Sequence, residues 1–449
     1  MAQLVNHPQV EMVGIDALKP DPKNPRTHSK KQIEQMVSSI RQLGFRGALL
    51  VDEQNRIVAG LARWLAAKQL GMDVVPVIRE HFVSEEQRLA FIIADNRFAE
   101  LSEWDDALLK DNLGALFEAG VDIEVTGFST ADLDFSMDTG TPDEGLVELP
   151  APNAVAVSRP GDLWLIGPHR LYCGDARDAV SYEALMAGEL AAMIFADGPY
   201  NLQIAGFVSG LGKKTHREFV SGSGELSKSE FLAFLRAVFR NCVRFSIDGS
   251  IHYQCMDWRH MREMLDASEG VYTELKQLLV WNKQVGGMGS FYRSQHELIF
   301  TFKSGRGRHI NNFGLGEKGR YRTNVLDYPG ANTFRKGRQA DLEAHPTVKP
   351  VALVADLMRD CSHRGDLILD PFSGSGTTLI AAHKTGRRGA AIEIDPLYCD
   401  TSLRRLAQAS GLAILHADGR SFEEVAADRR RADEQGSGIP DTPSGKDRS

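Results

Sequence analysis

The pattern of hydrophobic and polar positions predicts a small α/β unit at the start of the chain. Leu49–Val51 and Arg56–Val58 flank the polar stretch Asp52–Asn55, an arrangement typical of a β-hairpin. Two helical periods and one more strand pattern follow, over residues 61–70, 84–94 and 72–78. We expect this unit to span residues 1–135.

From about residue 161 to residue 420, strand-sized apolar runs alternate with helical periods. Strands separated by helices are typical of a parallel sheet covered on both faces, so the expected fold class is α/β with a mostly parallel sheet. The expected strands are 190–196, 250–255, 275–281, 297–302, 366–369 and 389–394, and the expected helices are 231–243, 353–361 and 377–384.

Two stretches lack these patterns. Residues 136–160 are acidic and rich in proline and glycine, which is a linker composition. Residues 421–449 are charged and then rich in glycine, serine and proline, and we expect them to form a disordered tail.

The composition of the 449 residues, 42% hydrophobic and 25% charged, is that of a globular protein of more than one domain. The chain has no apolar run of roughly 18 residues and no basic-plus-apolar leader, so we expect no membrane and a cytoplasmic location. Its five cysteines form no CxxC pair, which argues against a zinc site or a disulfide framework.

The net charge of −8 is unevenly distributed. Between Lys283 and Arg338, eleven basic residues against three acids leave a local net charge of +8. Because phosphate attraction is short-ranged at physiological salt, such a segment on an acidic protein can still bind DNA. A solvated charged loop is the alternative.

One candidate site begins at Asp370, where the sequence reads Asp-Pro-Phe-Ser-Gly-Ser-Gly-Thr-Thr. It joins an expected strand to an expected helix, and Gly374 and Gly376 let the backbone turn sharply and approach a ligand. Free N–H groups at the helix start near Thr377 lie beside this loop. Glu393 ends the next strand, 23 positions beyond Asp370, where an acid can accept hydrogen bonds from ribose hydroxyls.

A second candidate site is Asp197-Gly198-Pro199-Tyr200, at the end of the buried strand pattern 190–196. A carboxylate beside an aromatic ring at a strand end suits a planar base. The acid can accept hydrogen bonds from an amino group while the ring stacks on the base.

Together, these two segments resemble the signature motifs of the amino-methyltransferases, which transfer a methyl group from S-adenosylmethionine to an exocyclic nitrogen of adenine or cytosine in DNA. The base-holding motif comes before the cofactor motif, which is the order of the family's β class. The resemblance spans roughly residues 159–410. It implies a Rossmann-like, S-adenosylmethionine-dependent methyltransferase fold.

The resemblance also implies roles for individual residues. Asp197 and the Gly198 carbonyl would accept the hydrogens of the target amine, with Pro199 completing the turn. Tyr200 would stack on a base that has left the duplex. The residues implied to bind the cofactor are Asp370, Phe372, Gly374, Gly376, Thr377 and Glu393, with Asp175 at its adenine and Thr347 and Lys349 of the stretch His345–Pro350 at its methionine part.

The sequence departs from the family pattern at Gly198, where proline is usual. The backbone carbonyl survives this change, and we expect Gly198→Pro to be tolerated where φ is near −65°. Methylation at cytosine carbon uses a cysteine that typically follows a proline, and none of the five cysteines here does so.

In β-class enzymes the target-recognition region lies between the two motif groups, which here includes residues 283–338. Arginine suits both phosphate and guanine-edge contacts. The DNA-binding residues expected in this segment are Arg293, Arg320, Arg322, Arg335 and Arg338.

Residues 11–100 resemble the ParB-like N-terminal domain of partition proteins, through stretches such as Asn24–Arg26 and Val75–Ile78. Nucleotide-handling members carry a Gly-Glu-Arg-Arg type box. Here the box reads Gly60-Leu61-Ala62-Arg63, so we expect a DNA-contacting or accessory role, with Arg63 either packing a helix or contacting phosphate.

The favoured interpretation is a DNA methyltransferase acting on adenine N6, because Asp rather than Ser opens the catalytic motif. It would act on double-stranded DNA as part of restriction-modification, in bacteria or phage. Homodimer formation is one option for its assembly. The alternatives are methylation of cytosine N4, a catalytically silent DNA-binding adaptor, and RNA methylation.

Overall fold

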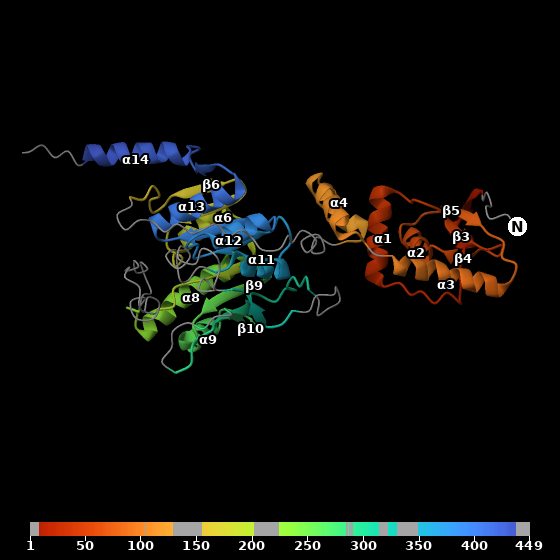
Figure 1. Ribbon diagram of the computed structural model, residues 1–449, viewed down its shortest axis with the longest axis horizontal. Coiled ribbons are helices and arrows are strands. Elements are labelled where there is room, and N and C mark those ends of the chain that lie inside the picture. The colour runs from red at the N-terminus through yellow and green to blue at the C-terminus, as the bar shows by residue number, and fades with distance from the viewer. Residues whose placement is uncertain are drawn as a thin grey trace, which may run out of the picture. The chain divides into compact units, whose positions relative to one another are not determined.

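The computed structural model describes residues 9–102, 104–128, 155–201, 224–283, 286, 291–313, 322–329 and 349–436. Contacts within the chain divide it into two compact units, Met1–Asp138 and Thr139–Ser449 (Figure 1).

The first unit is built on a five-stranded sheet with the order β1-β5-β3-β4-β2. Strands β3 and β4 pair antiparallel, as the hairpin pattern predicted. The core includes Leu49, Ile57, Trp64 and Val77, all buried. The elements are β1 (Val10–Gly14), η1 (Ile15–Ala17), β2 (Lys19–Pro20), α1 (Lys30–Leu43), β3 (Leu49–Val51), β4 (Arg56–Ala59), α2 (Leu61–Gln69), β5 (Val74–Arg79), α3 (Glu85–Leu101), α4 (Asp106–Glu118) and η2 (Ile123–Thr126).

The box at Gly60 opens helix α2. Gly60 has φ +94°, in the left-handed region that glycine adopts without strain, and it is the N-cap of the helix. The guanidinium of Arg63 donates to the carbonyl oxygen of Arg46 at 3.2 Å. This bond supports the packing interpretation of Arg63.

The second unit contains a ten-stranded sheet with the order β12-β10-β11-β9-β8-β13-β14-β7-β6-β15. Its strands are β6 (Leu163–Ile166), β7 (His169–Cys173), β8 (Ala191–Ala196), β9 (Ser246–Met256), β10 (Glu274–Asn282), β11 (His296–Lys303), β12 (Val325–Asp327), β13 (Leu367–Asp370), β14 (Arg388–Glu393) and β15 (Ile414–His416). Its helices are α6 (Ala179–Met186), α8 (Lys228–Arg244), η3 (Trp258–His260), α9 (Met261–Ser268), α11 (Val351–Cys361), α12 (Thr377–Lys384), α13 (Pro396–Ser410) and α14 (Phe422–Gly436).

The sheet is parallel in its centre and mixed at its sides. Strands β9, β8, β13, β14 and β7 are parallel neighbours, as predicted. Strand β11 is antiparallel to β9 and β10, and β6 is antiparallel to β7 and β15. Strands β10 and β11 are consecutive in the chain, as are β6 and β7, so each of these two antiparallel pairs is a hairpin.

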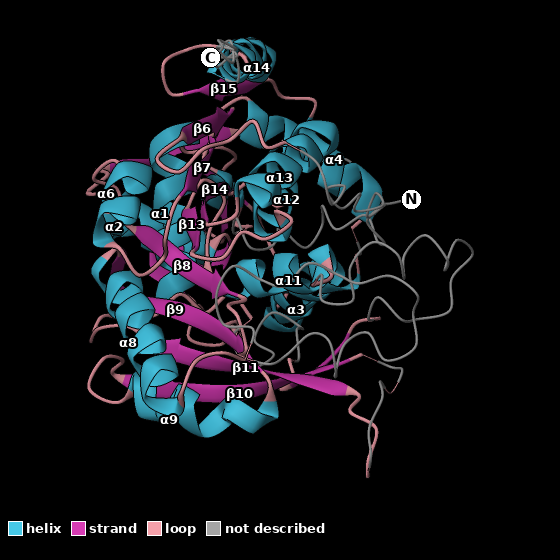
Figure 2. Ribbon diagram, turned by 90° about the vertical axis from the view of Figure 1, so that its left-hand side faces the viewer, coloured by secondary structure: helices cyan, strands magenta, loops and turns pink. Residues whose placement is uncertain are grey.

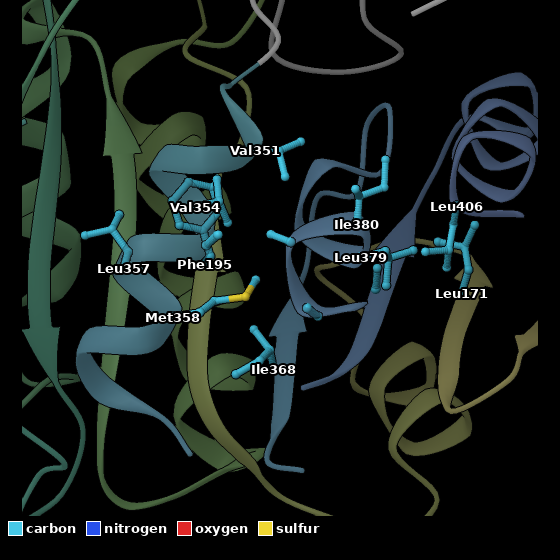
Figure 3. Close-up of a cluster of buried hydrophobic side chains, with 14 of the residues drawn as sticks. Leu171, Phe195, Val351, Val354, Leu357, Met358, Ile368, Leu379, Ile380 and Leu406 are labelled. Carbon is cyan, nitrogen blue, oxygen red and sulfur yellow. The ribbon is translucent and has the colours of Figure 1, made fainter. Parts of the chain in front are cut away.

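Helices cover both faces of this sheet. Figure 2 shows α6, α8 and α9 on one side and α11, α12 and α13 on the other. On the second side, Val354 and Met358 of α11 pack with Phe195 of β8 and Ile368 of β13 (Figure 3). Each face therefore has its own apolar core, and strand β8 is buried along its whole length.

The prediction of a disordered tail is wrong for residues 422–436, which form helix α14. Phe422 and Val425 are buried, and the Arg429 guanidinium donates to the Asp162 carboxylate at 2.8 Å. Charged residues dominate the composition of this stretch, but they alternate at helical spacing with a few apolar residues that dock on the sheet. Residues 437–449 lie outside the described part of the chain.

The topology places the candidate motifs at one edge of the sheet. Parallel pairing puts the carboxyl ends of β7, β8, β13 and β14 at the same edge. From β8 the chain continues through α8 to β9 on one side, and from β13 it continues through α12 to β14 on the other. The boundary between β8 and β13 is therefore a topological switch point, where α/β proteins form binding crevices.

Candidate active site

Asp197 follows directly on the buried strand β8. Its carboxylate accepts a hydrogen bond from the Tyr200 hydroxyl at 2.8 Å, so the acid and the aromatic ring of the motif are held together. Both side chains are half-buried. The turn therefore combines a rigid strand end with partial access to the site.

A buried lysine binds this carboxylate. The ammonium of Lys349, 4% exposed, donates to both Asp197 oxygens at 2.8 Å. It lies 2.7 Å from a Glu297 oxygen and 3.1 Å from the Tyr200 hydroxyl. The Lys283 ammonium binds the second Glu297 oxygen. Two cations and two carboxylates thus alternate in one network around Tyr200.

The pKa shifts follow from this arrangement. Burial alone would lower the pKa of Lys349, but the charges of Asp197 and Glu297 outweigh it and raise the pKa above its usual range. Burial likewise opposes ionisation of Glu297, but Lys349 and Lys283 lower its pKa to about 2. Burial and the nearby acids raise the pKa of Tyr200 well above 10. At neutral pH Lys349 and Glu297 are therefore charged and Tyr200 is neutral.

Lys349 and Thr347 were expected at the cofactor. The structure places the Lys349 ammonium on the Asp197 carboxylate, and Thr347 lies outside the described residues. Glu297 and Lys283 were missed as site residues. The available signal for Glu297 was an acid at the start of the otherwise apolar run 297–302, where a buried charge needs a partner.

The glycine loop joins β13 to α12 as predicted. Asp370 is buried and accepts a hydrogen bond from the Phe372 N–H at 2.8 Å, so it holds the turn. Glu393 is buried at the end of β14, and its two oxygens accept from the N–H groups of Gly374 (2.7 Å) and Asp395 (2.9 Å). Burial, which outweighs these hydrogen bonds, raises the pKa of Asp370 and of Glu393 to about 7.

The two glycines of the loop differ in their surroundings. Both have positive φ, +52° at Gly374 and +83° at Gly376. Among the described residues, a Cβ on Gly374 would meet only the Phe372 carbonyl oxygen, at 4.0 Å, whereas a Cβ on Gly376 would collide with the Ser402 hydroxyl of α13. The described residues therefore leave space beside Gly374 that a ligand could occupy, and Gly376 allows the close packing of α13. Thr377 begins α12 and is buried.

Asp175 lies beside this loop. Its neighbour Gly174 donates its N–H to the Glu393 carbonyl oxygen at 2.8 Å, because β7 pairs with β14. The carboxylate is bound by the Arg177 side chain and by the Arg177 N–H at 2.8 Å. Burial opposes the ionisation of Asp175, but the bonds to Arg177 lower its pKa overall. The structure thus brings Asp175, Glu393 and Gly374 to one place.

The turn Asp197–Tyr200, which is the proposed catalytic turn, packs directly against the glycine loop Asp370–Gly376, which is the proposed cofactor loop. A Cβ on Gly198 would lie 2.8 Å from Cε2 of the Phe372 ring. Phe372 in turn packs against Phe234 of α8, with 6.0 Å between ring centroids. This contact argues against tolerance of Gly198→Pro, because proline would require the Phe372 ring to move. The sequence could not show the contact, since the two residues are far apart along the chain.

Asn201 follows the turn and binds the backbone of residues 224–226. Its φ is +51°, and its side-chain amide donates to the Leu226 carbonyl oxygen at 2.8 Å. Its amide oxygen accepts from the N–H groups of Gly224 and Leu226. Asn201 therefore fixes the end of the catalytic turn to the start of the segment that leads into α8.

The expected DNA-binding arginines do not form one set. Arg322 is bound at 2.7 Å to Asp360 and at 3.1 Å to Asp356, both on α11, so its role as a DNA contact is corrected to that of a structural ion pair. Arg293 is exposed. Arg320, Arg335 and Arg338 lie outside the described residues.

The described part of the basic segment is also divided between two edges of the sheet. Lys283 leaves β10 at the edge that carries Asp197, and its charge is taken up by Glu297. Arg306 and Arg308 are exposed but follow the carboxyl end of the antiparallel strand β11, at the opposite edge. The local charge of +8 therefore does not correspond to a single binding face.

Comparison with known protein families agrees with the geometry. A DNA methylase model of the N6/N4 family matches residues 191–404, a ParB N-terminal domain model matches 1–97, and a ParB-methyltransferase helix-turn-helix model matches 107–160. The fold and site thus define a DNA methyltransferase. The chain thus carries a domain of the N6/N4 DNA methylase family over residues 191–404, with a ParB-like domain fused at its N-terminal side. The helix-turn-helix match was missed from sequence, and it includes residues 136–160, whose composition is that of a linker.

Individual relatives cover both units. The chain is 28% identical to the DNA adenine methyltransferase YhdJ of Escherichia coli over 57% of this chain and 86% of that protein. It is 43% identical to the E. coli ParB-like nuclease domain-containing protein YnaK over 16% of this chain and 85% of that protein. Among solved structures, it is similar to the PvuII DNA methyltransferase (cytosine-N4-specific), with 14% identity, a TM-score of 0.41, and coverage of 62% and 95% of the two chains.

None of the described helices is long and apolar enough to cross a membrane.

Proposed function

We propose that this protein transfers the methyl group of S-adenosylmethionine to adenine N6 in double-stranded DNA. The observation that carries the proposal is the direct packing of the catalytic turn on the cofactor loop, through Gly198 and Phe372 at the switch point of the sheet. Methyl donor and acceptor must meet in line for a direct displacement. Two sites that touch across neighbouring strand ends provide that positioning.

The residues at the glycine loop fit S-adenosylmethionine. The space beside Gly374 is open, and Glu393 presents a buried carboxylate with free lone pairs at the end of β14, where ribose hydroxyls would donate. Asp175 would receive the adenine end, while Asp370 holds the loop in shape and Phe372 forms its wall toward Asp197. When bound, the cofactor supplies an electrophilic methyl group.

Asp197 and the Gly198 carbonyl would orient the target amine by accepting its hydrogens. In the present structure Asp197 already accepts from Lys349 and Tyr200. We infer that the amine displaces the Tyr200 hydroxyl, while Lys349 keeps the carboxylate in position. Tyr200, released from Asp197, would then stack on the base.

Glu297 and Lys283 would support this arrangement from the neighbouring strands. The attacking nitrogen becomes positively charged as the methyl group transfers, and a lone Lys349 ammonium nearby would oppose that charge. Glu297 offsets Lys349, and the Asp197 carboxylate then favours the developing positive charge. We therefore assign Glu297 and Lys349 as positioning residues for Asp197.

Adenine is the proposed target for two reasons. Aspartate opens the catalytic motif. In addition, 57% of this chain aligns with the DNA adenine methyltransferase YhdJ, at 28% identity. Cytosine N4 is the second candidate, because the family includes both specificities. Homodimer formation and a cytoplasmic, nucleoid-associated location are further predictions of this proposal.

The test is methyl transfer by the purified full chain. Unmethylated bacterial DNA and, separately, RNA would be incubated with S-adenosylmethionine, and the nucleosides analysed by mass spectrometry. We expect N6-methyladenine in DNA from the wild type and none from Asp197→Ala. N4-methylcytosine would transfer the assignment to the second candidate, methylated RNA alone would refute a DNA substrate, and cofactor binding without any methyl transfer would favour the silent adaptor.

A further inference from the structure

Two aromatic side chains of the second unit are strongly exposed to solvent. Phe291 and Tyr292, in the connection between β10 and β11, are 88% and 83% exposed. Within the described part of the second unit, no other large hydrophobic side chain is as exposed. Their rings pack edge to face with centroids 4.6 Å apart. An exposed pair of large aromatic rings is unfavourable in water and marks a binding surface.

The β10–β11 hairpin connects this aromatic pair to the catalytic network. Strands β10 and β11 lie side by side at one margin of the sheet (Figure 2). The Lys283 N–H donates to the Gln295 carbonyl oxygen at 2.9 Å, which closes the stem of the hairpin. Lys283 also binds Glu297, which binds Lys349. Tyr292 is five residues from Glu297, so an extended chain keeps their Cα atoms within about 18 Å.

The hairpin also points to the correct edge. Strand β8 is parallel to β9, β9 is antiparallel to β11, and β11 is antiparallel to β10. Strand β10 therefore runs in the same direction as β8. The connection after Asn282 therefore leaves the sheet at the edge where Asp197 lies. A nucleic acid that presents a base to Asp197 must cover this edge.

The charge beside the rings favours a polyanion over an apolar protein partner. Arg293, next to Tyr292, is exposed. Basic residues position a DNA backbone, and apolar or aromatic side chains can enter the space between base steps. The exposed rings of Phe291 and Tyr292 could stack on bases, and the adjacent Arg293 could bind a phosphate. This combination suits a DNA duplex from which one base has been removed from the stack.

On this basis, and resting on the proposed function, we propose that Phe291 and Tyr292 stack into the duplex next to the target and stabilise the gap left when the base moves to Asp197. Tyr200 and this aromatic pair then have separate tasks. Tyr200 stacks on the extruded base, and the pair replaces that base within the helix. The two aromatic sites are on different strand ends, so each can be altered alone.

The experiment uses the full chain and a duplex carrying its recognition sequence, identified by sequencing of methylated DNA. One substrate has 2-aminopurine at the target, whose fluorescence rises when the base unstacks. A second has the target adenine opposite an abasic position, where extrusion needs little unpairing. Variants are Phe291→Ala/Tyr292→Ala and, as a matched control, Leu275→Ala, an exposed apolar residue of β10 toward the opposite edge.

We expect the double variant to keep the wild-type melting temperature and to lose at least about tenfold in 2-aminopurine signal and in methylation of the matched duplex. On the abasic duplex its methylation should approach the wild-type rate, and Leu275→Ala should match the wild type throughout. Equal behaviour of the double variant and the wild type on the matched duplex would overturn the proposal.

Two further outcomes are informative. Loss of self-association by the double variant in sedimentation, with base extrusion unchanged, would assign the pair to a contact between copies of the chain and overturn the proposal. A wild type that neither extrudes nor methylates a base would refute the proposed function itself, and the proposal with it.

Discussion

The ring of Phe372 lies where a side chain at position 198 would stand. A Cβ on Gly198 would be 2.8 Å from Cε2 and 3.1 Å from Cδ2 of that ring. The catalytic turn and the cofactor loop therefore share one packing surface, and the glycine is what allows them to approach so closely. The presence of glycine at this position is thus explained by its packing against Phe372, and it gives no reason to regard the enzyme as silent.

Gly198→Ala should accordingly reduce turnover by about 10- to 100-fold, because displacement of the Phe372 ring would misplace the methyl donor relative to the amine. Steady-state kinetics and cofactor titration would measure the loss. Phe372→Leu frees space near position 198, so the double variant should recover part of the activity, with a coupling energy of about 0.5–3 kcal/mol. Strictly additive effects would show that the two residues do not interact as described.

The sequence predicted those parts of the site that are contiguous in the chain. The stretches at Asp197 and Asp370 combine a strand end, a turn and a following element within a few residues, so their local chemistry is readable. Lys349 lies within a recognisable motif, but its actual partner, Asp197, is 152 positions away. Glu297 comes from a third segment, and its role depends on sheet order, which the strand pattern does not fix.

Electrostatic partners were the least predictable feature. Arg322 has the residue type and location of a DNA contact, but α11 places Asp356 and Asp360 against it. Likewise, residues 422–436 have a charged composition typical of a tail, while Phe422 and Val425 are enough to dock a helix. In both cases a few tertiary contacts outweigh the local composition.

Cofactor affinity should increase with pH around neutrality. Burial raises the pKa of Glu393 to about 7, so the ionised form that accepts most strongly from hydroxyls is populated as the pH rises from about 6 to about 8. Calorimetric titration with S-adenosylmethionine across this range should show the rise, and Glu393→Gln should flatten it. A wild-type affinity that is independent of pH would argue against a ribose contact by Glu393.

The same carboxyl group affects the stability of the ligand-free protein with the opposite sign. Its folded pKa of about 7 lies above the usual 4.5, so the fold favours the protonated form. The stabilisation is fully present below about pH 4.5 and is lost as the pH rises through about 7. Thermal melts should therefore show a decline over this window that is shallower in Glu393→Gln.

Gly374→Ala and Gly376→Ala should fail in different ways. Both substitutions carry the backbone penalty of a positive φ, about 1–2 kcal/mol. Only the second adds a collision with Ser402, so Gly376→Ala should melt at a clearly lower temperature than Gly374→Ala. Gly374→Ala should chiefly weaken cofactor binding, because its methyl group points into open space. Equal melting temperatures would contradict the packing role of Gly376.

Arg322→Ala and Arg293→Ala compare an arginine bound within the fold with an exposed one. Loss of the hydrogen bonds to Asp356 and Asp360 should destabilise the fold by about 1.5–3 kcal/mol. Arg293→Ala should leave the unfolding free energy unchanged. If Arg293 contacts a phosphate, its removal should reduce the slope of log affinity against log salt by about 0.9. Denaturant melts and DNA titrations at several salt concentrations would separate the two roles, and an unchanged salt slope would remove Arg293 from the DNA interface.

Lys349→Met should impair both stability and turnover, for separable reasons. The lysine keeps the Glu297 pKa near 2, and this depressed pKa contributes stability that is present above about pH 4.5 and lost as the pH falls toward 2. Without Lys349, Lys283 is the one ionic partner of Glu297 that remains among the residues described by the structure. The fold at neutral pH should then lose about 3 kcal/mol, the lower end for breaking a buried pair. Turnover should fall because Asp197 loses the contact that fixes both of its oxygens.

The double variant Lys349→Met/Glu297→Gln distinguishes these two effects. Removing the charge of Glu297 relieves the uncompensated carboxylate, so the unfolding free energy at neutral pH should return toward the wild-type value. Turnover should stay low, because the Asp197 carboxylate still lacks its cation, and Lys349→Arg should retain more activity than Lys349→Met. Recovery of turnover together with stability in the double variant would reduce Lys349 to a purely structural residue. Stability restored without turnover would establish that the lysine positions Asp197 for attack by the amine.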